Sequence, residues 1–420
     1  MSKKYIFTAL LSVLMSGCLI SLNTVADTVK DKIDSYPDKI PALSSLVDEV
    51  LKSNPEIQAI EAERDAVIAK ARAADQPLYN PEVELDVENT DIQTSSLGFS
   101  QTIDWTDKKS ARSKAAQFEK NQYDAKLNLS RQTLGAELLQ ALSNFHTQNE
   151  LDELSKQRIE LLQGFVALAQ KRRQSGDLSQ VELSLARLAL SDAKIQRTRS
   201  ASQLIKTRQS LIALVGHENR QWPDLPDALP ELKPQQENIE KILMQLPILQ
   251  EQLSRISAAK ANIKLRSREQ NADPTISLRG GREDSENLIG FNLSVPLYVR
   301  NNFRAEVDMA SAQLIQAERN SQNIARLSRA ELITSAQRYQ LVRESWQVWQ
   351  QAGQASLNKQ TGLIQQLWEA GEINTTDYFL QLNQTLDMRS NAIDLRQELW
   401  INWIDWLLAS NRLHFWLGIN

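Results

Sequence analysis

The chain has 420 residues, a formal net charge of −4, 24 % charged residues and 41 % hydrophobic residues. This balance gives no electrostatic reason to expect a nucleic-acid partner, because the phosphate backbone attracts strongly basic surfaces. Cys18 is the single cysteine, which excludes an internal disulfide and a cysteine metal site, so packing alone must hold the fold.

The first residues are typical of an export signal, because two lysines precede an apolar run over residues 5–14. Cleavage after Ala26 would make 1–26 a signal peptide. The four residues that end at Cys18 resemble a bacterial lipobox, and this alternative would remove 1–17 and leave Cys18 lipidated. Both alternatives predict export, whereas a cytoplasmic membrane anchor is disfavoured because the apolar run is short for a span.

A helix is expected from Pro41 to Gln76, a stretch rich in Ala, Glu, Lys and Arg, with a candidate break at Asn54-Pro55. Residues 82–88 then alternate between acidic and apolar side chains, which indicates a β-strand with two different faces. Residues 97–103 continue the alternation as a second strand, with Gln101 as the exception. The first strand carries four carboxylates on one face, those of Glu82, Glu84, Asp86 and Glu88.

A very long helix is expected after these strands, because no proline occurs between Glu82 and Trp222 and the chain can run as one helix from Asp104 to Gln174. About 70 residues at about 1.5 Å each would span on the order of 100 Å. Its apolar side chains form a narrow seam, typical of a coiled coil rather than of a helix on a globular core. The seam comprises Leu151, Leu154, Leu161, Phe165 and Leu168.

The second half of the chain repeats the first at an offset of about 193 residues. Asn80-Pro81 corresponds to Asp273-Pro274, and the turn at Gly176-Asp177 corresponds to that at Gly371-Glu372. Several collinear matches at nearly one offset argue against chance. The chain is therefore expected to contain two copies of one unit.

Four prolines crowd between residues 223 and 234, where they exclude a helix interior and indicate a linker. We therefore expect a first repeat over 40–216, a proline-rich linker over 217–236 and a second repeat over 237–413. Each repeat is expected to run helix, strand, strand, long helix, helix. The fold class is then mainly α with a small β part.

The strands are expected to need partners. Strands of about nine or ten residues with one apolar and one polar face suit a tilted membrane β-strand. Four strands cannot close a barrel, for which about eight is the practical minimum, and an open edge in lipid leaves backbone groups unpaired. Copies of the chain would therefore join. The alternative is a soluble periplasmic coiled-coil scaffold on which the strands form a small half-buried sheet.

The chain resembles the TolC-like outer-membrane efflux proteins over nearly its whole mature length. The branch that serves heavy-metal resistance, the cobalt–zinc–cadmium type, is the most similar. Residues 80–89 resemble the first strand of this branch. Residues 100–104, followed by Lys109, resemble its second strand and the start of the next helix. Residues 296–302 resemble the corresponding strand-to-helix segment of the second repeat. One departure is visible, because this branch usually has glycine where this chain has Thr106-Asp107.

The resemblance implies a homotrimer with a long α-helical barrel tunnel in the periplasm and a 12-strand β-barrel in the lipid of the outer membrane. It also implies two protein partners, a periplasmic adaptor (membrane fusion) protein and an inner-membrane RND pump. The expected function is an outer-membrane channel subunit of a tripartite efflux system that exports heavy-metal cations. The alternatives are a duct for drug efflux or protein secretion, and the non-channel scaffold.

By the same resemblance, the two helix turns close the tunnel and meet the adaptor. A glycine ends the incoming helix in each turn, and Ser179 or Asn374 can cap the outgoing one. An equally weighted alternative is that these residues only make the turn. The candidate gate and adaptor contacts are Arg172, Arg173, Gly176, Ser179, Glu182, Trp368, Gly371, Glu372, Thr375 and Asp377.

The four strand carboxylates named above are the candidate barrel lining, where they would raise the local concentration of cations. The alternative is simply a wetted polar face. No cofactor, metal site or catalytic residue is expected, because the three histidines lie far apart and no phosphate loop, Gly-x-Ser-x-Gly or HExxH motif occurs. Six late tryptophans are expected mainly to pack, with membrane-edge anchoring as an alternative. They are Trp346, Trp349, Trp400, Trp403, Trp406 and Trp416.

Overall fold

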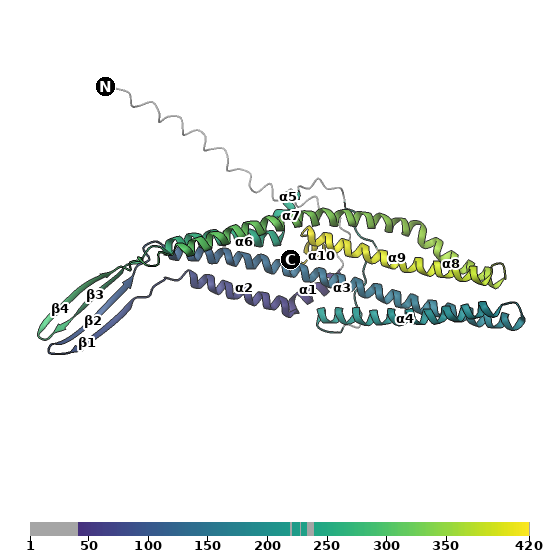
Figure 1. The fold of residues 1–420 in the computed structure, drawn as a ribbon, viewed down its shortest axis with the longest axis horizontal. Coiled ribbons are helices and arrows are strands. Elements are labelled where there is room, and N and C mark those ends of the chain that lie inside the picture. Colours follow the sequence, from purple (N-terminus) through teal and green to yellow (C-terminus); the bar gives the residue numbers. More distant parts are fainter. Residues whose placement is uncertain (1–40, 219–220, 227, 233–238, 420) are drawn as a thin grey trace, which may run out of the picture.

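The computed structural model describes residues 41–218, 221–226, 228–232 and 239–419. The predicted signal peptide and Cys18 lie outside the described residues. The described chain is elongated, with a sheet at one end and long helices that extend from it to two helix turns at the opposite end (Figure 1). None of the described helices is both long enough and apolar enough to cross a membrane.

The first repeat has the predicted order of elements. They are α1 (Pro41–Ser53), α2 (Pro55–Ala74), β1 (Glu82–Asn89), β2 (Gln93–Thr102), α3 (Lys108–Ser175) and α4 (Gln180–Val215). The predicted break is confirmed, because Asn54 is extended and its side chain accepts a hydrogen bond from the backbone N–H of Glu56 at 2.9 Å. The prediction of one very long helix is also confirmed, since α3 runs over 68 residues.

The second repeat follows the same plan with one interruption. Its elements are α5 (Ile239–Gln245), α6 (Pro247–Glu269), β3 (Thr275–Glu283), β4 (Glu286–Ser294), α7 (Arg304–Val348), the π-helical turn η2 (Trp349–Gly353), α8 (Gln354–Glu369), α9 (Thr375–Ala409) and α10 (Leu413–Leu417). The π-helical turn, which the sequence patterns did not predict, divides the helix that corresponds to α3. A Cβ atom at Gly353 would lie 2.3 Å from the Trp349 ring, so glycine lets the indole pack at this turn.

The four strands form one antiparallel sheet in the order β1-β2-β3-β4. Its central pair joins the two repeats, with Phe99 of β2 opposite Leu278 of β3. The hydroxyl groups of Thr102 and Thr275 form a hydrogen bond of 2.8 Å across this pair. In the described chain β1 and β4 are therefore edge strands, and each has one side without a strand partner.

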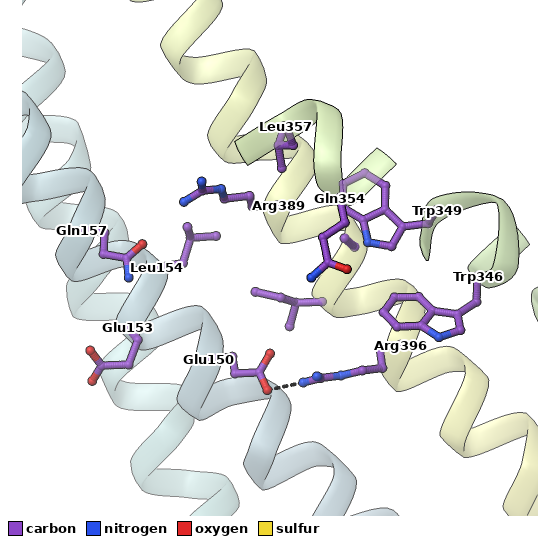
Figure 2. A pocket seen from close by; sticks show the side chains of 12 residues that line it. Glu150, Glu153, Leu154, Gln157, Trp346, Trp349, Gln354, Leu357, Arg389 and Arg396 are labelled. Atoms are coloured by element: carbon purple, nitrogen blue, oxygen red, sulfur yellow. Dashed lines mark hydrogen bonds and ion pairs between the residues drawn. The ribbon is translucent and has the colours of Figure 1, made fainter. Parts of the chain in front are cut away.

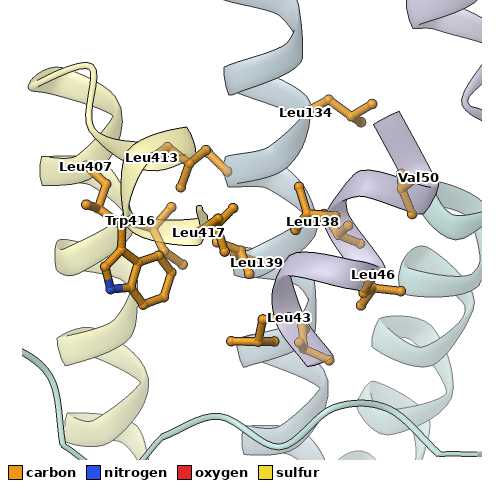
Figure 3. Close-up of a cluster of buried hydrophobic side chains, with 14 of the residues drawn as sticks. Leu43, Leu46, Val50, Leu134, Leu138, Leu139, Leu407, Leu413, Trp416 and Leu417 are labelled. Carbon is orange, nitrogen blue, oxygen red and sulfur yellow. The ribbon is translucent and has the colours of Figure 1, made fainter. Parts of the chain in front are cut away.

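The main core lies near the middle of the molecule, where α1, α3, α9 and α10 meet (Figures 1 and 3). Leu43 of α1, Leu139 of α3 and Leu413 of α10 are fully buried in this cluster. Aromatic rings of α9 and α10 complete it. The packing interpretation is confirmed for the buried tryptophans Trp400, Trp403, Trp406 and Trp416.

A second core lies near the helix turns, between α3, α4, α8 and α9. There the predicted narrow seam of α3 is partly wrong. Phe165 is buried as expected, but Leu161 and Leu168 are only half-buried, and Leu162 and Ala169 are fully buried instead. Because α3 packs on α4 and also on α9, its buried stripe is wider than that of a two-helix coiled coil.

The described parts of the predicted linker lie against the helices. The Tyr339 hydroxyl of α7 donates a hydrogen bond to the carbonyl oxygen of Pro230 at 2.5 Å. On the α3 side, Nε2 of His146 lies 2.8 Å from the carbonyl oxygen of Pro223. The linker therefore contacts helices of both repeats, while its predicted boundaries stay a prediction.

Candidate channel surfaces and helix turns

The four candidate lining carboxylates share one face of the sheet, as the alternation predicts. Their register partners on β2 are Ser100, Gly98, Ser96 and Thr94. All four acidic residues are exposed, and no hydrogen bond or ion pair engages their side chains within the described chain. The structure thus brings these residues together, and their role as a lining stays a prediction.

The opposite face of the sheet is apolar and exposed. Phe99 lies in register with Leu278 of β3, which pairs in turn with Phe291 of β4. At the two edges, Leu85 of β1 is 76 % exposed and Ile289 of β4 is 89 % exposed. A contiguous apolar surface of this kind marks contact with lipid or with another protein.

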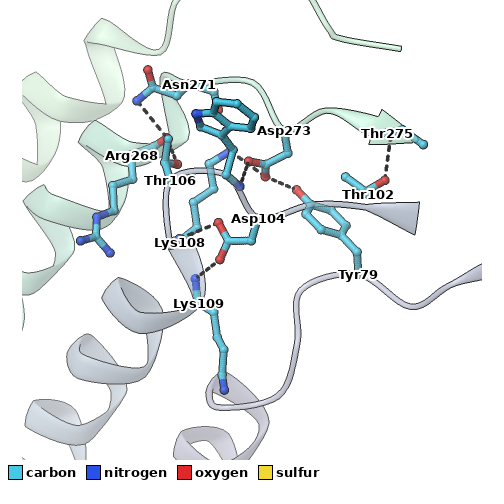
Figure 4. Close-up of polar contacts among 11 residues, drawn as sticks. Tyr79, Thr102, Asp104, Thr106, Lys108, Lys109, Arg268, Asn271, Asp273 and Thr275 are labelled. Carbon is cyan, nitrogen blue, oxygen red and sulfur yellow. Dashed lines mark hydrogen bonds and ion pairs between the residues drawn. The ribbon is translucent and has the colours of Figure 1, made fainter. Parts of the chain in front are cut away.

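A buried ion pair joins the two repeats where the sheet meets the helices (Figure 4). Lys108 Nζ lies 2.8 Å from Asp273 Oδ2, and the two side chains are only 8 % and 3 % exposed. The Tyr79 hydroxyl also donates a hydrogen bond to Asp273, at 2.7 Å. Burial, together with this hydrogen bond, raises the pKa of Tyr79 to about 12. The network fixes three separate chain segments to one another at the junction.

The start of α3 explains the departure from the branch pattern. Asp107 is left-handed, with φ 60°, and Phe303 has the same conformation, with φ 55°, at the corresponding start of α7. Glycine adopts this conformation without steric cost, and aspartate visits it more readily than most residues. Arg268 of α6 binds both the backbone oxygen and the carboxylate of Asp107, so the second repeat holds this bend.

The first helix turn satisfies its own backbone. Gly176 is left-handed, with φ 89°, and the Asp177 N–H donates to the Arg172 carbonyl oxygen at 2.8 Å. Ser179 and Glu182 form a capping box, in which each side chain accepts a hydrogen bond from the other residue's backbone N–H. The hydrogen bonds from Ser179 lower the pKa of Glu182. Three of the predicted contact residues, Gly176, Ser179 and Glu182, therefore build the turn.

The second turn repeats this geometry. Gly371 is left-handed, with φ 79°, and Asn374 caps α9 by accepting a hydrogen bond from the Asp377 N–H at 2.8 Å. The Asn374 amide also donates to the Asp377 carboxylate at 2.7 Å. Thr375 is buried beside this cap, whereas Glu372 is exposed. Asp377 is thus part of the cap, and Glu372 is a candidate for an outside contact.

The two turns are held together by one arginine. Arg172 donates hydrogen bonds to the carbonyl oxygens of Trp368 and Glu369, at 2.8 and 3.2 Å. Trp368 is buried and stacks on Tyr378 with 4.7 Å between ring centroids. Arg173, by contrast, is exposed and its side chain has no partner within the described chain. Arg172 and Trp368 therefore join the hairpins, and Arg173 is available to a partner protein.

The sequence patterns missed an apolar groove between α4 and α9. It has a volume of about 440 Å³ and is lined by Leu185, Leu188 and Phe379 among other residues. The exposed apolar row of α4 continues along the helix from Val181 to Ile195. The signal was present, because Val181, Leu185, Leu188 and Ile195 follow the 4-3-7 spacing of a coiled-coil face.

A second cavity, of about 350 Å³, lies beside the π-helical turn between α3 and α9 (Figure 2). Trp346 and Trp349 form one wall of this cavity. On the other side Glu150 of α3 and Arg396 of α9 form an ion pair. No sequence pattern indicated this cavity, because it depends on a local change of helix type.

Comparison with known proteins points to one family. The family model for outer membrane efflux proteins matches residues 46–217. The cobalt–zinc–cadmium resistance protein CzcC of Cupriavidus metallidurans is 26 % identical over 261 residues, which cover 59 % of this chain and 61 % of that protein. The match therefore spans less than two thirds of the relative's length.

Solved structures share the fold. That of CusC has a TM-score of 0.74 at 16 % identity and covers 88 % of this chain and 92 % of its own. The Campylobacter jejuni CmeC outer membrane channel has a TM-score of 0.73 at 15 % identity, with 88 % and 86 % coverage. The mainly helical fold with a small antiparallel sheet is thereby confirmed, as is the predicted resemblance. Residues 46–217 are thus similar in sequence to outer membrane efflux proteins, and the chain shares the fold of solved outer-membrane channels over 88 % of its length.

Proposed function

We propose that the chain is the outer-membrane channel subunit of a tripartite efflux system and that it works as a homotrimer. The observation that carries the proposal is the sheet, which has two open edges, an exposed apolar face and an acidic face. Three such sheets would supply the 12 strands of a closed barrel, with the apolar face toward lipid and the acidic face toward the lumen.

The helices support the same assembly. The exposed apolar row of α4, from Val181 to Ile195, has the spacing of a helix–helix contact but no described partner in its own chain. In a trimer this row would pack on a helix of the neighbouring copy. The helices would then continue the barrel as a tunnel, and the two helix turns would form its end.

We propose that the cargo consists of heavy-metal cations. The relative CzcC is named for cobalt, zinc and cadmium resistance, and the four β1 carboxylates of three copies would line the barrel. Within the described ranges no three metal-ligating side chains converge, so charge rather than chelation would concentrate the cations in the lumen. The metal choice would then be made by the inner-membrane RND pump.

The exposed ends of the helix turns are the proposed docking site for a periplasmic adaptor. The side chains of Arg173 and Glu372 are exposed there and make no described contact within the turns. Opposite charges on neighbouring turns can fix the orientation of a partner. The other predicted contact residues would act indirectly, by holding the turns in shape.

The test combines assembly with transport. The purified mature protein is expected to extract only with detergent and to have the mass of a trimer by light scattering. A strain that lacks the gene should become sensitive to zinc, cobalt and cadmium, and the wild-type gene should restore resistance. A water-soluble monomer would overturn the channel proposal, and sensitivity to hydrophobic drugs alone would overturn the metal cargo.

The lining is tested separately. Replacement of all four β1 acidic residues by glutamine should reduce the cation preference of single channels in planar bilayers. The trimer yield of this variant serves as the control. An unchanged preference in a normally assembled variant would remove the lining role.

A further inference from the structure

One row of residues crosses the acidic face of the sheet from edge to edge. Glu84 of β1 lies opposite Gly98, which lies opposite Arg279 of β3, which lies opposite Gly290 of β4. Arg279 is the one cationic residue on this face of the described strands. The acidic residues on the same face are Glu82, Glu84, Asp86, Glu88, Glu283 and Glu286.

Arg279 points away from the acidic residues of β1. A Cβ atom at Gly290 would lie 2.7 Å from Nε and 2.9 Å from Cγ of Arg279, so the arginine side chain extends across β4. Glu84 lies on the far side, with its Oε2 atom 3.7 Å from the Cβ position of Gly98. Arg279 is exposed and has no hydrogen bond or ion pair within the described chain. Its guanidinium group is therefore directed to the open edge of the sheet.

The opposite edge of the sheet has the complementary charge. β1 carries four exposed carboxylates, and none has a described basic partner. Since the four strands alternate in direction, β4 of one copy and β1 of a second copy would again be antiparallel. Both edges have unpaired backbone groups that can form such a ladder. The acidic faces would then be continuous.

We propose that Arg279 is the residue that pairs neighbouring copies, by crossing Gly290 and binding a carboxylate on β1 of a second copy of this chain. Gly290 is required because any larger residue would lift the arginine from the strand. The proposal deepens the proposed trimer and rests on it. It assigns the interface a polar contact on the lumen side, while apolar side chains face outward.

The first test is a charge exchange. Arg279→Glu is expected to raise the monomer fraction in detergent about tenfold or more, because the lost pair and the new repulsion recur at three interfaces. Four double variants then combine Arg279→Glu with arginine at position 82, 84, 86 or 88. One of them should restore the trimer and so identify the partner carboxylate. Circular dichroism checks that each monomer is folded.

The second test uses two glycines of the same sheet. Gly290→Ala should weaken the trimer in the same direction as Arg279→Glu. Gly280→Ala is the matched control, since the nearest atom to its Cβ position is the Leu288 carbonyl oxygen at 4.0 Å, and it should leave the trimer unchanged.

The outcomes separate the two proposals. A wild-type protein that is monomeric would overturn the proposed function itself. A stable wild-type trimer that Arg279→Glu does not weaken would overturn only the role of Arg279. Failure of all four exchanges to restore assembly would also overturn that role.

Discussion

The guanidinium group of Arg172 lies 4.7 Å from the ring centroid of Trp368 and donates a hydrogen bond to the carbonyl oxygen of the same residue at 2.8 Å. Arg172 lies in the last turn of α3 and Trp368 in the last turn of α8, so this contact joins the two repeats at the end farthest from the sheet (Figure 1). A contact that closes the gap between the hairpins must break if they are to separate. Its strength therefore bears on any opening of the proposed channel.

Replacing Arg172 by methionine should loosen the helix turns. The variant loses two charge-assisted hydrogen bonds and a cation–π contact at a partly exposed site, together about 1–2 kcal/mol. We expect faster hydrogen exchange at the backbone amides of residues 367–373, and higher single-channel conductance. Arg173→Met is the control, because Arg173 makes no described side-chain contact. Equal exchange rates in the two variants would contradict the joining role.

Reversing the charge of Arg173 should affect docking instead. Arg173→Glu is expected to lower export in cells while the trimer yield stays unchanged, because the side chain is exposed and free of the turn. The same reversal at Asp377 is expected to lower export, but it also disturbs the cap with Asn374. Export and purified trimer are measured in parallel. Normal export by both variants would rule out this docking site.

The buried ion pair of Lys108 and Asp273 predicts that replacing Lys108 lowers the free energy of unfolding much more than replacing its neighbour Lys109. Lys108→Met leaves the Asp273 carboxylate buried without its cation, which should lower the free energy of unfolding by about 3 kcal/mol. Lys109→Met removes only an exposed pair with Asp75 at 3.7 Å and should cost under about 1 kcal/mol. Urea unfolding in detergent, followed by circular dichroism, measures both. Similar decreases in the free energy of unfolding for the two variants would show that the ion pair of Lys108 is no more buried in solution than that of Lys109.

Tyr79, at the same junction, makes the stability of the folded protein depend on pH. Its pKa is raised from 10.0 to about 12, so the folded protein holds the phenol proton more tightly than the unfolded chain. The stabilising contribution is complete below pH 10 and disappears as the pH rises toward 12. Tyr79→Phe should lower the free energy of unfolding by about 1 kcal/mol at pH 8. The difference in this free energy between the variant and wild type should vanish toward pH 12. A constant difference over this range would contradict the assignment.

Gly353, the last residue of the π-helical turn, and Gly362, within α8, offer a matched pair of substitutions. Gly353→Ala would place a Cβ atom 2.3 Å from the Trp349 ring, whereas nothing lies within 4 Å of the Cβ position of Gly362. The first variant should be destabilised by about 1–3 kcal/mol. The second should be unchanged or stabilised by up to about 1 kcal/mol, because alanine favours a helix. Thermal unfolding compares them, and equal midpoints would contradict the indole contact.

Local patterns in the sequence predicted most of the fold. Strict alternation over 82–88, the absence of proline between Glu82 and Trp222 and the glycines of the two turns each depend on nearby residues, and the structure agrees with all three. Repetition at one offset also predicted that the second half would have the same order. These features are fixed by backbone geometry and by the period of the apolar residues.

Contacts between distant residues could not be predicted in this way. Lys108 and Asp273 are 165 positions apart, and Arg172 meets Trp368 over 196 positions. No local period indicates which distant partner a charged side chain will reach. The π-helical turn was missed for a related reason, since it follows from how the Trp349 ring fits against Gly353 rather than from a period.

The site was predicted only in part. The turns at Gly176 and Gly371 were located correctly, but the separate tasks of their residues depend on side-chain direction. Neighbouring Arg172 and Arg173 illustrate this, because one binds the opposite hairpin and the other faces solvent. A helix that rotates by about 100° per residue gives adjacent side chains different surroundings.

The strand pair at the centre of the sheet has a consequence for biogenesis. Phe99 meets Leu278, so the middle of the sheet cannot form until the third strand has been synthesised and delivered. A nascent chain that has been synthesised only as far as the proline-rich segment contains a single hairpin. Both edges of this hairpin lack a strand partner, and one of its faces is apolar. Such a hairpin readily aggregates. We therefore expect the unfinished polypeptide to need this hairpin shielded until its second half is present.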